Sequence, residues 1–146
     1  MSPKNPEPVV DDDLAVHLRV AIMRVSRRLR VDVGGGAVTA GQYSVLICLW
    51  KEPRTLGQLA ERERVQAPSM TRIAKALEEQ GYVERRANPE DGRQVLIAIT
   101  EAGRGIVEDV RGQRTAWLSR HVADLDPADR AVLSRAAELL KEMNAS

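Results

Sequence analysis

The sequence predicts a mainly α-helical protein with one small β-hairpin, and three observations lead to this prediction. Apolar residues recur at helical spacing through most of the chain between residues 11 and 143. Residues 82–99 interrupt that pattern with two short strand-like runs on either side of a turn-rich tip. Aromatic residues make up only 3% of the chain and Phe is absent, so the core must be aliphatic.

Composition narrows the class of protein further. The 146 residues suffice for one domain or one subunit of an obligate dimer, and a hydrophobic content of 43% excludes a disordered chain. The formal net charge is only +1, so nucleic-acid binding would need a local basic surface. One cysteine rules out an intramolecular disulfide. We expect a cytoplasmic protein with no membrane partner, because no apolar run resembles a signal peptide or a membrane span.

The N-terminal part of the chain predicts a disordered segment and then a long helix. Residues 1–10 contain three prolines and no periodic pattern, so we expect them to be disordered. The acidic run that starts at Asp11 suits a helix N-terminus, and the glycines at 34–36 end this helix. Its apolar stripe has near-heptad spacing and comprises Leu14, Leu18, Ala21, Ile22, Val25 and Leu29.

Three further helices follow in the centre of the chain. Residues 39–42 have capping-box spacing and begin the second helix, which we expect Pro53 to end. Residues 55–58 form another capping box before a short third helix. A turn near residues 64–65 leads into the fourth helix, which Gly81 ends. Two short helices joined by a tight turn predict a helix-turn-helix.

The fourth helix has one apolar face and one polar face. Met70, Ile73, Ala74 and Leu77 fall at the spacing of a buried stripe. The opposite face carries short hydroxyls and cations, without an acidic residue before Glu78. Such a face suits the DNA major groove, because hydroxyls reach phosphates and a guanidinium reaches a guanine edge. The candidate residues are Ser69, Thr71, Arg72 and Lys75.

The hairpin and two long helices complete the chain. Residues 82–87 and 95–99 predict the two strands of a wing directly after the helix-turn-helix. Thr100 caps a helix that runs to about residue 123, and an Asp-Pro pair at 126–127 begins the last helix. The apolar stripes of the first and last helices exceed what a small central domain can cover, so we expect a homodimer. The last stripe comprises Val132, Leu133, Ala136, Leu139, Leu140 and Met143.

These motifs resemble those of the MarR family of bacterial transcriptional regulators over residues 11–144. The resemblance rests on Asp91-x-Arg93, on Ile99-Thr100-x-x-Gly103, and on Leu77-Glu78-Glu79-x-Gly81-Tyr82-Val83-x-Arg85. It implies a winged helix-turn-helix DNA-binding domain over residues 37–100. A helical dimerisation region, residues 11–36 and 101–146, would flank this domain. The resemblance also places Ala67 and Pro68 close to DNA.

The wing supplies further candidates for DNA contact. By resemblance, Arg93 enters the minor groove, where narrow A·T-rich segments attract guanidinium groups. Asp91 would hold either this arginine or the turn, and a solvated Asp-Arg surface pair is the alternative. Arg86 is favoured over its neighbour as a phosphate contact. Arg54 and Thr55 are further phosphate candidates, although Thr55 is equally expected to be a plain helix cap.

The predicted function is that of a transcriptional regulator that binds a specific, pseudo-palindromic site in double-stranded DNA. The resemblance implies a repressor that a small, often anionic aromatic, ligand releases by changing the dimer geometry. Two alternatives remain, a winged-helix protein-interaction module without specific DNA binding and a redox-responsive regulator that acts through Cys48. An inert buried thiol is the favoured interpretation of Cys48. The sequence predicts no enzyme, cofactor or metal site, and the ligand-binding residues stay unknown.

Overall fold

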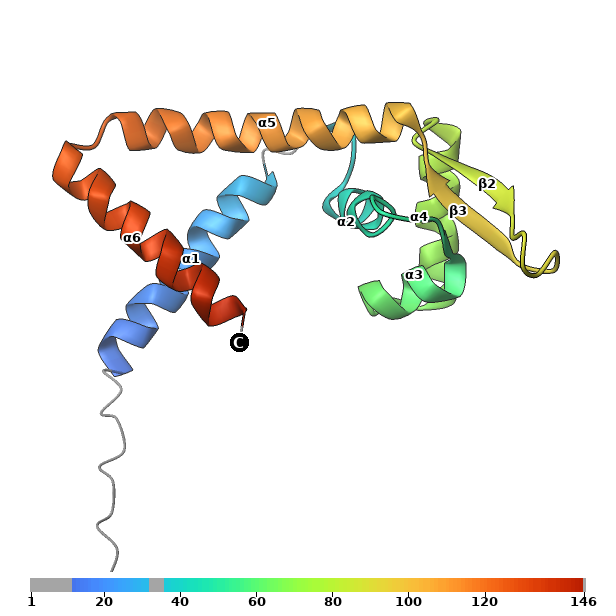
Figure 1. The fold of residues 1–146 in the computed structure, drawn as a ribbon, viewed down its shortest axis with the longest axis horizontal. Helices are drawn as coiled ribbons and strands as arrows, with labels where there is room; N and C mark the ends of the chain where they lie inside the picture. The colour runs from blue at the N-terminus through green and yellow to red at the C-terminus, as the bar shows by residue number, and fades with distance from the viewer. Residues whose placement is uncertain (1–11, 32–35, 146) are drawn as a thin grey trace, which may run out of the picture.

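The computed structural model describes residues 12–31 and 36–145, so the disordered N-terminus expected over residues 1–10 lies outside the described residues. Six helices and three short strands form a mainly α-helical fold with a small antiparallel sheet (Figure 1). The elements are α1 (Asp12–Val31), α2 (Ala40–Cys48), β1 (Arg54–Thr55), α3 (Leu56–Glu63), α4 (Ala67–Glu79), β2 (Val83–Ala87), β3 (Val95–Ile99), α5 (Glu101–Ala123) and α6 (Pro127–Asn144).

Local capping rules place the helix starts where the sequence predicts them. The hydroxyls of Thr39 and Thr55 each accept a hydrogen bond from the backbone N–H three residues later. The glutamine at that third position returns a hydrogen bond to the backbone of the threonine, which completes both capping boxes. Asp126 is the N-cap of α6, directly before Pro127, and its side chain accepts from the backbone N–H of Asp129. The helix starts are therefore set by short-range chemistry.

The end of α2 differs from the prediction. We expected Pro53 to end this helix, but the helix ends at Cys48 and Leu49 is its C-cap. Leu49 is still buried, so the apolar pattern continues beyond the helix and conceals its end. The guanidinium of Arg54 donates from Nε to the carbonyl oxygen of Cys48 at 3.0 Å, and it thereby satisfies an end carbonyl of α2.

The sheet contains one strand more than the predicted hairpin. Its order is β1-β3-β2, and β3 pairs with both neighbours in antiparallel register. The predicted hairpin is confirmed, with Val83 opposite Ile99 and Ala87 opposite Val95. The added strand β1 has only two residues, opposite Ile97 and Leu96. It joins the start of α3 to the wing, so the helix-turn-helix and the wing share one sheet.

The hydrophobic core lies within the compact unit formed by α2, β1, α3, α4, β2 and β3 (residues 40–99), which we call the winged unit. The first half of α5 closes this core, because Val107 and Val110 are fully buried against it. The largest buried side chains are aliphatic, as the composition predicts. They are Leu46, Leu49, Leu59, Met70, Leu77 and Ile97.

The remaining helices extend away from the winged unit. Figure 1 shows α5 running from the wing along one edge of the molecule to α6, with α1 and α6 on the side away from the hairpin. The predicted apolar stripes of these two helices are largely exposed in the single chain, with Val132 65% and Met143 69% exposed. None of the helices within residues 12–31 and 36–145 has the length and apolar character to cross a membrane.

Candidate nucleic-acid interface

The exposed face of α4 begins at an uncapped N-terminus. Gln66 is the N-cap, and its side chain makes no capping hydrogen bond. The first turn contains Pro68 and no acidic residue, so the positive end of the helix dipole is not neutralised within its own first turn. Backbone N–H groups in a first turn have no partner inside the helix, which suits an anion such as phosphate.

The polar face of α4 has the exposure that contact with DNA requires. Met70, Ala74 and Leu77 are buried, so the opposite side of the helix faces solvent. The hydroxyl of Thr71 donates to the carbonyl oxygen of Ala67 at 3.0 Å, which leaves the Thr71 oxygen as an acceptor only. Ser69 is half-buried. The exposed candidates on this face are Ala67, Pro68, Thr71, Arg72 and Lys75.

A Schellman motif ends α4 and connects it to the wing. Gly81 has a positive φ of 79°, which is the left-handed conformation that the sequence predicts there. The N–H of Tyr82 donates to the carbonyl oxygen of Leu77 at 2.9 Å, and the N–H of Gly81 donates to Glu78 at 3.0 Å. The hydroxyl of Thr100 then donates to the carbonyl oxygen of Gly81 at 2.6 Å. The end of α4 is thus bound to the start of α5.

The wing tip presents Arg93 to solvent. The carboxylate of Asp91 accepts a hydrogen bond from the backbone N–H of Arg93 at 3.0 Å, so Asp91 holds the turn. This is one of the two roles expected for Asp91. The other role, an ion pair with the guanidinium of Arg93, does not occur in the described residues. The guanidinium is therefore exposed and available to a partner.

Two other arginines of the wing are engaged in ion pairs. Arg85 lies opposite Ile97 and Arg86 opposite Leu96, so they point to the two faces of the sheet. Arg85 pairs with Glu78 at 2.6 Å, and Arg86 pairs with Glu84 at 2.6 Å. Both pairs are about half exposed, so each holds its arginine only weakly. Arg86 stays a candidate for phosphate contact, which would require it to break its ion pair with Glu84.

These pairs neutralise two arginines and two glutamates of residues 62–93, while Glu79, Glu90 and Asp91 stay exposed. The net charge of residues 62–93 is only +1, but two glutamates are neutralised by Arg85 and Arg86. A third, Glu63, faces α2 and accepts from Ser44. Exposed cations without an ion pair to any described residue then remain along α3, α4 and the wing. They are Arg62, Arg64, Arg72, Lys75 and Arg93.

Arg54, a predicted phosphate contact, already has two partners within the protein. Its side chain is only 16% exposed, because it donates to the carbonyl oxygen of Cys48 and pairs with Glu52 at 3.2 Å. A guanidinium held this way stabilises the end of α2, and a phosphate contact by Arg54 stays a prediction. Thr55 caps α3 through its hydroxyl, which accepts from the N–H of Gln58 at 3.2 Å. Thr55 is therefore a helix cap, and its contact with phosphate stays a prediction.

A groove beside α4 adds two residues that the sequence did not single out for DNA contact. A hollow of about 310 Å³ lies between the N-terminus of α2 and the middle of α4. Thr39 and Gln42 of α2 border it together with Ser69 and Arg72. The capping box at residues 39–42 predicts a helix N-terminus. The position of that N-terminus beside α4 depends on the tertiary fold, so the sequence could not show it.

Cys48 lies in an environment that suppresses its reactivity. The thiol is half-buried and donates to Oε1 of Glu63 at 3.1 Å, and the hydroxyl of Ser44 donates to the same oxygen at 2.9 Å. Burial is the main cause that raises the pKa of Cys48, and the hydrogen bond and negative charge of Glu63 raise it further. Arg62 and Arg54 lower it by less. This environment supports the inert thiol over the redox alternative.

We expect Cys48 to be alkylated by iodoacetamide more slowly than a free cysteine at pH 8. A raised pKa leaves less thiolate at that pH, and the thiolate fraction grows only as the pH rises through the pKa. Mass spectrometry of the alkylated protein over time measures this rate. Alkylation faster than that of a free cysteine, or a change in duplex affinity after peroxide treatment, would restore the redox alternative.

The fold and this surface together define a winged helix-turn-helix DNA-binding transcriptional regulator. The profile of the MarR family matches residues 38–95. An HTH-type transcriptional regulator of Mycobacterium tuberculosis is 42% identical over 131 residues, which cover 89% of this chain and 92% of that one. The chain therefore belongs to the MarR family.

Two solved structures illustrate how widely the fold is shared. A MarR family protein from Bacillus stearothermophilus has a TM-score of 0.73 at 21% identity, covering 92% of this chain and 95% of that one. A MepR variant from Staphylococcus aureus, bound to an oligodeoxyribonucleotide, has a TM-score of 0.70 at 17% identity, covering 90% and 96%. At these identities the likeness concerns the fold alone.

Proposed function

We propose that the protein binds a specific site in double-stranded DNA through α4 and the wing. One observation carries this proposal: the uncapped, cationic N-terminal half of α4 and the exposed Arg93 belong to one sheet-linked unit. In this proposal α4 enters the major groove and Arg93 the adjacent minor groove. The protein would work in the cytoplasm, and no catalytic step is part of the proposal.

The exposed apolar stripes of α1 and α6 support a homodimer. Leu14, Ile22 and Val25 of α1 and Leu133 and Leu139 of α6 are each more than one third exposed. Such surface normally marks an interface, and a second copy offers the same surface in return. A two-fold dimer would place two winged units on a pseudo-palindromic site with half-sites about one helical turn apart. The division into a dimerisation region and residues 37–100 belongs to this proposal.

The direct test is a fluorescence-anisotropy titration against duplex from the region upstream of the protein's own gene. Binding should be tight, resist unrelated competitor duplex, and weaken steeply between low and moderate salt as counterions are released. Size-exclusion chromatography with light scattering should give a dimer. Weak binding that unrelated duplex abolishes would favour the protein-interaction module over the specific regulator.

We expect Arg93→Ala to weaken binding to the specific duplex by about 1–3 kcal/mol. The reason is that a guanidinium in the minor groove is lost, while Asp91 still holds the backbone of the turn. The same titration measures it, and Asp91→Ala, which removes the acceptor of the turn and retains Arg93, separates the turn from the cation. Unchanged affinity in Arg93→Ala would remove the wing from the proposed interface.

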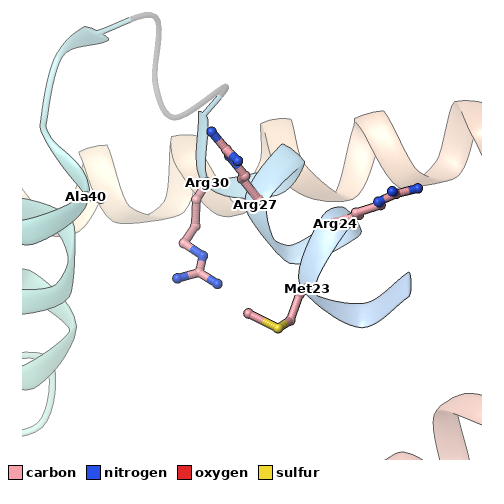
Figure 2. A pocket seen from close by; sticks show the side chains of 5 residues that line it. All are labelled: Met23, Arg24, Arg27, Arg30 and Ala40. Carbon is pink, nitrogen blue, oxygen red and sulfur yellow. The ribbon is translucent and has the colours of Figure 1, made fainter. Parts of the chain in front are cut away.

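Repression released by a small anion is the regulatory part of the proposal. A cavity of about 600 Å³ between α1 and α2 is lined by Met23, Ala40 and three arginines of α1. Figure 2 shows Met23 and Arg30 extending from the same side of α1, while Arg24 and Arg27 extend elsewhere. Arg30, which also donates to the hydroxyl of Ser26 at 2.9 Å, and the apolar Met23 line the same cavity, and this combination fits an aromatic carboxylate. Benzoate added to the preformed duplex complex should lower the anisotropy if this is correct.

A further inference from the structure

Arg114 of α5 holds two other helices at once. Its guanidinium carbon lies 4.5 Å from the centre of the Tyr43 ring, which belongs to α2. Its Nε donates to the carbonyl oxygen of Leu29, in α1, at 3.0 Å. A planar guanidinium can stack on a ring and donate in its own plane at the same time, which a lysine ammonium cannot reproduce.

The contact with α1 lies where a cation has the greatest effect on that helix. Leu29 is in the last turn of α1, which ends at Val31. Carbonyl groups in a last turn have no partner within the helix, and the helix dipole is negative there. Arg114 is also half-buried, so its hydrogen bond is shielded from competing water. α5 therefore holds the end of α1 that leads into the winged unit.

From α2 the contacts continue to the turn of the helix-turn-helix. Ser44, next to Tyr43, donates to Glu63 at 2.9 Å, as does Cys48 at 3.1 Å. Glu63 is the last residue of α3. The following Arg64 has a positive φ of 53°, which turns the chain toward α4. Arg114 is therefore connected to the turn before α4 by one stacking contact, on Tyr43, and one hydrogen-bonded step, from α2 to Glu63.

A cavity of about 470 Å³ lies alongside this chain of contacts. Its walls come from α1, α2, α3 and α5, which are the same four helices that Arg114, Tyr43, Ser44 and Glu63 join. Arg114 and Glu63 both border it. A change in the position of Arg114 would therefore alter the walls of the cavity at α3 and at α1 together.

We propose that Arg114 is a positioning residue that fixes the angle between the winged unit and the dimer helices, and so the spacing of the two α4 helices. This inference rests on the homodimer and the DNA binding put forward under the proposed function. The proposed role requires no contact of Arg114 with DNA. Arg114 acts by holding α1 and α2 against α5. The separation of the two α4 helices then matches the half-site spacing before DNA binds, so binding does not have to order the helices first.

The test measures the separation of the two winged units by double electron–electron resonance. A spin label is attached at Glu61→Cys, an exposed position of α3, in a Cys48→Ser background that keeps a donor to Glu63. The reference protein should give one narrow distance distribution. Arg114→Gln should broaden or shift it, and should weaken binding to the specific duplex by about 3- to 30-fold.

Arg111→Gln is the matched control. Arg111 lies one turn earlier on α5 and over the ring of Trp50 at 5.0 Å, without the hydrogen bond to α1. Its variant should keep the reference distribution. If Arg114→Gln does not fold, Tyr43→Leu, which removes the stacking surface and keeps an apolar side chain, is read by the same criterion.

The outcomes separate this inference from the function it rests on. An unchanged distance distribution in the Arg114 variant overturns the positioning role, whatever the duplex titration gives. Absence of any dipolar signal in the reference protein would contradict the homodimer. A reference protein that gives the narrow distribution but binds no duplex would contradict DNA binding, while the distances still decide the role of Arg114.

Discussion

We expect Gly103→Ala to lower the free energy of unfolding by about 3 kcal/mol. A methyl group at Gly103 would overlap the carbonyl oxygen of Tyr82 and lie 2.8 Å from Cγ1 of Ile99. The Tyr82 carbonyl cannot move aside easily, because it accepts the N–H of Thr100 at 3.0 Å. The clash outweighs the gain of up to about 1 kcal/mol that alanine brings to a helix interior.

Gly105→Ala on the same helix isolates the clash from helix propensity. Nothing lies within 4 Å of a methyl group at Gly105, so this variant should be as stable as the native protein or up to about 1 kcal/mol more stable. Urea denaturation followed by circular dichroism, at equal protein concentration for all variants, measures both changes. Equal stability of the two variants would mean that α5 can move away from Tyr82 and Ile99 at no cost.

The same contact explains why the Thr100-x-x-Gly103 motif occurs after the wing. Thr100 accepts the N–H of Gly103 at 3.1 Å and donates to Gly81, so the end of α4 and the start of α5 share one hydroxyl. Gly103 permits the backbone of Tyr82, just before β2, to lie against the first turn of α5. The motif therefore attaches the wing to α5. Its position could be found in the sequence, but its structural role could not.

Elements governed by short-range rules could be predicted from the sequence. The capping boxes at Thr39 and Thr55 and the left-handed Gly81 each depend on residues within five positions. The apolar face of α4 is also a local pattern, and Met70 and Leu77 are fully buried as it predicts. Helix starts, the wing and the buried face of the recognition helix therefore follow from sequence.

Features that depend on distant partners could not be predicted. β1 has two residues and no periodicity, and it exists only because β3 lies beside it some 40 residues later in the chain. Arg54 looked available for phosphate, but Glu52 and the end of α2 occupy it. The stacking of Arg114 on Tyr43 joins residues on helices that no local pattern relates. Where a side chain points is a tertiary property, whereas its residue type is not.

We expect Arg72→Ala to have a large effect on both the affinity and the sequence preference of DNA binding. Arg72 is exposed on α4, one turn from the uncapped N-terminus, and has no ion pair with a described residue. A guanidinium there can donate twice to one guanine, so its loss should cost about 1–3 kcal/mol in each half-site and relax the preference for that base pair. Titrations against the specific duplex and against duplexes changed at single positions measure both effects.

Two controls separate base recognition from plain charge. Lys75→Ala, one turn later on α4, should weaken binding to all duplexes alike and reduce the salt dependence, as loss of a phosphate contact does. Arg135→Ala removes the same side chain from α6, where Arg135 pairs with Glu138 on an exposed surface, and should change neither affinity nor preference. If Arg72→Ala weakened all duplexes equally, Arg72 would be a phosphate contact, and sequence recognition would have to come from the remaining residues of α4 or from the shape of the DNA.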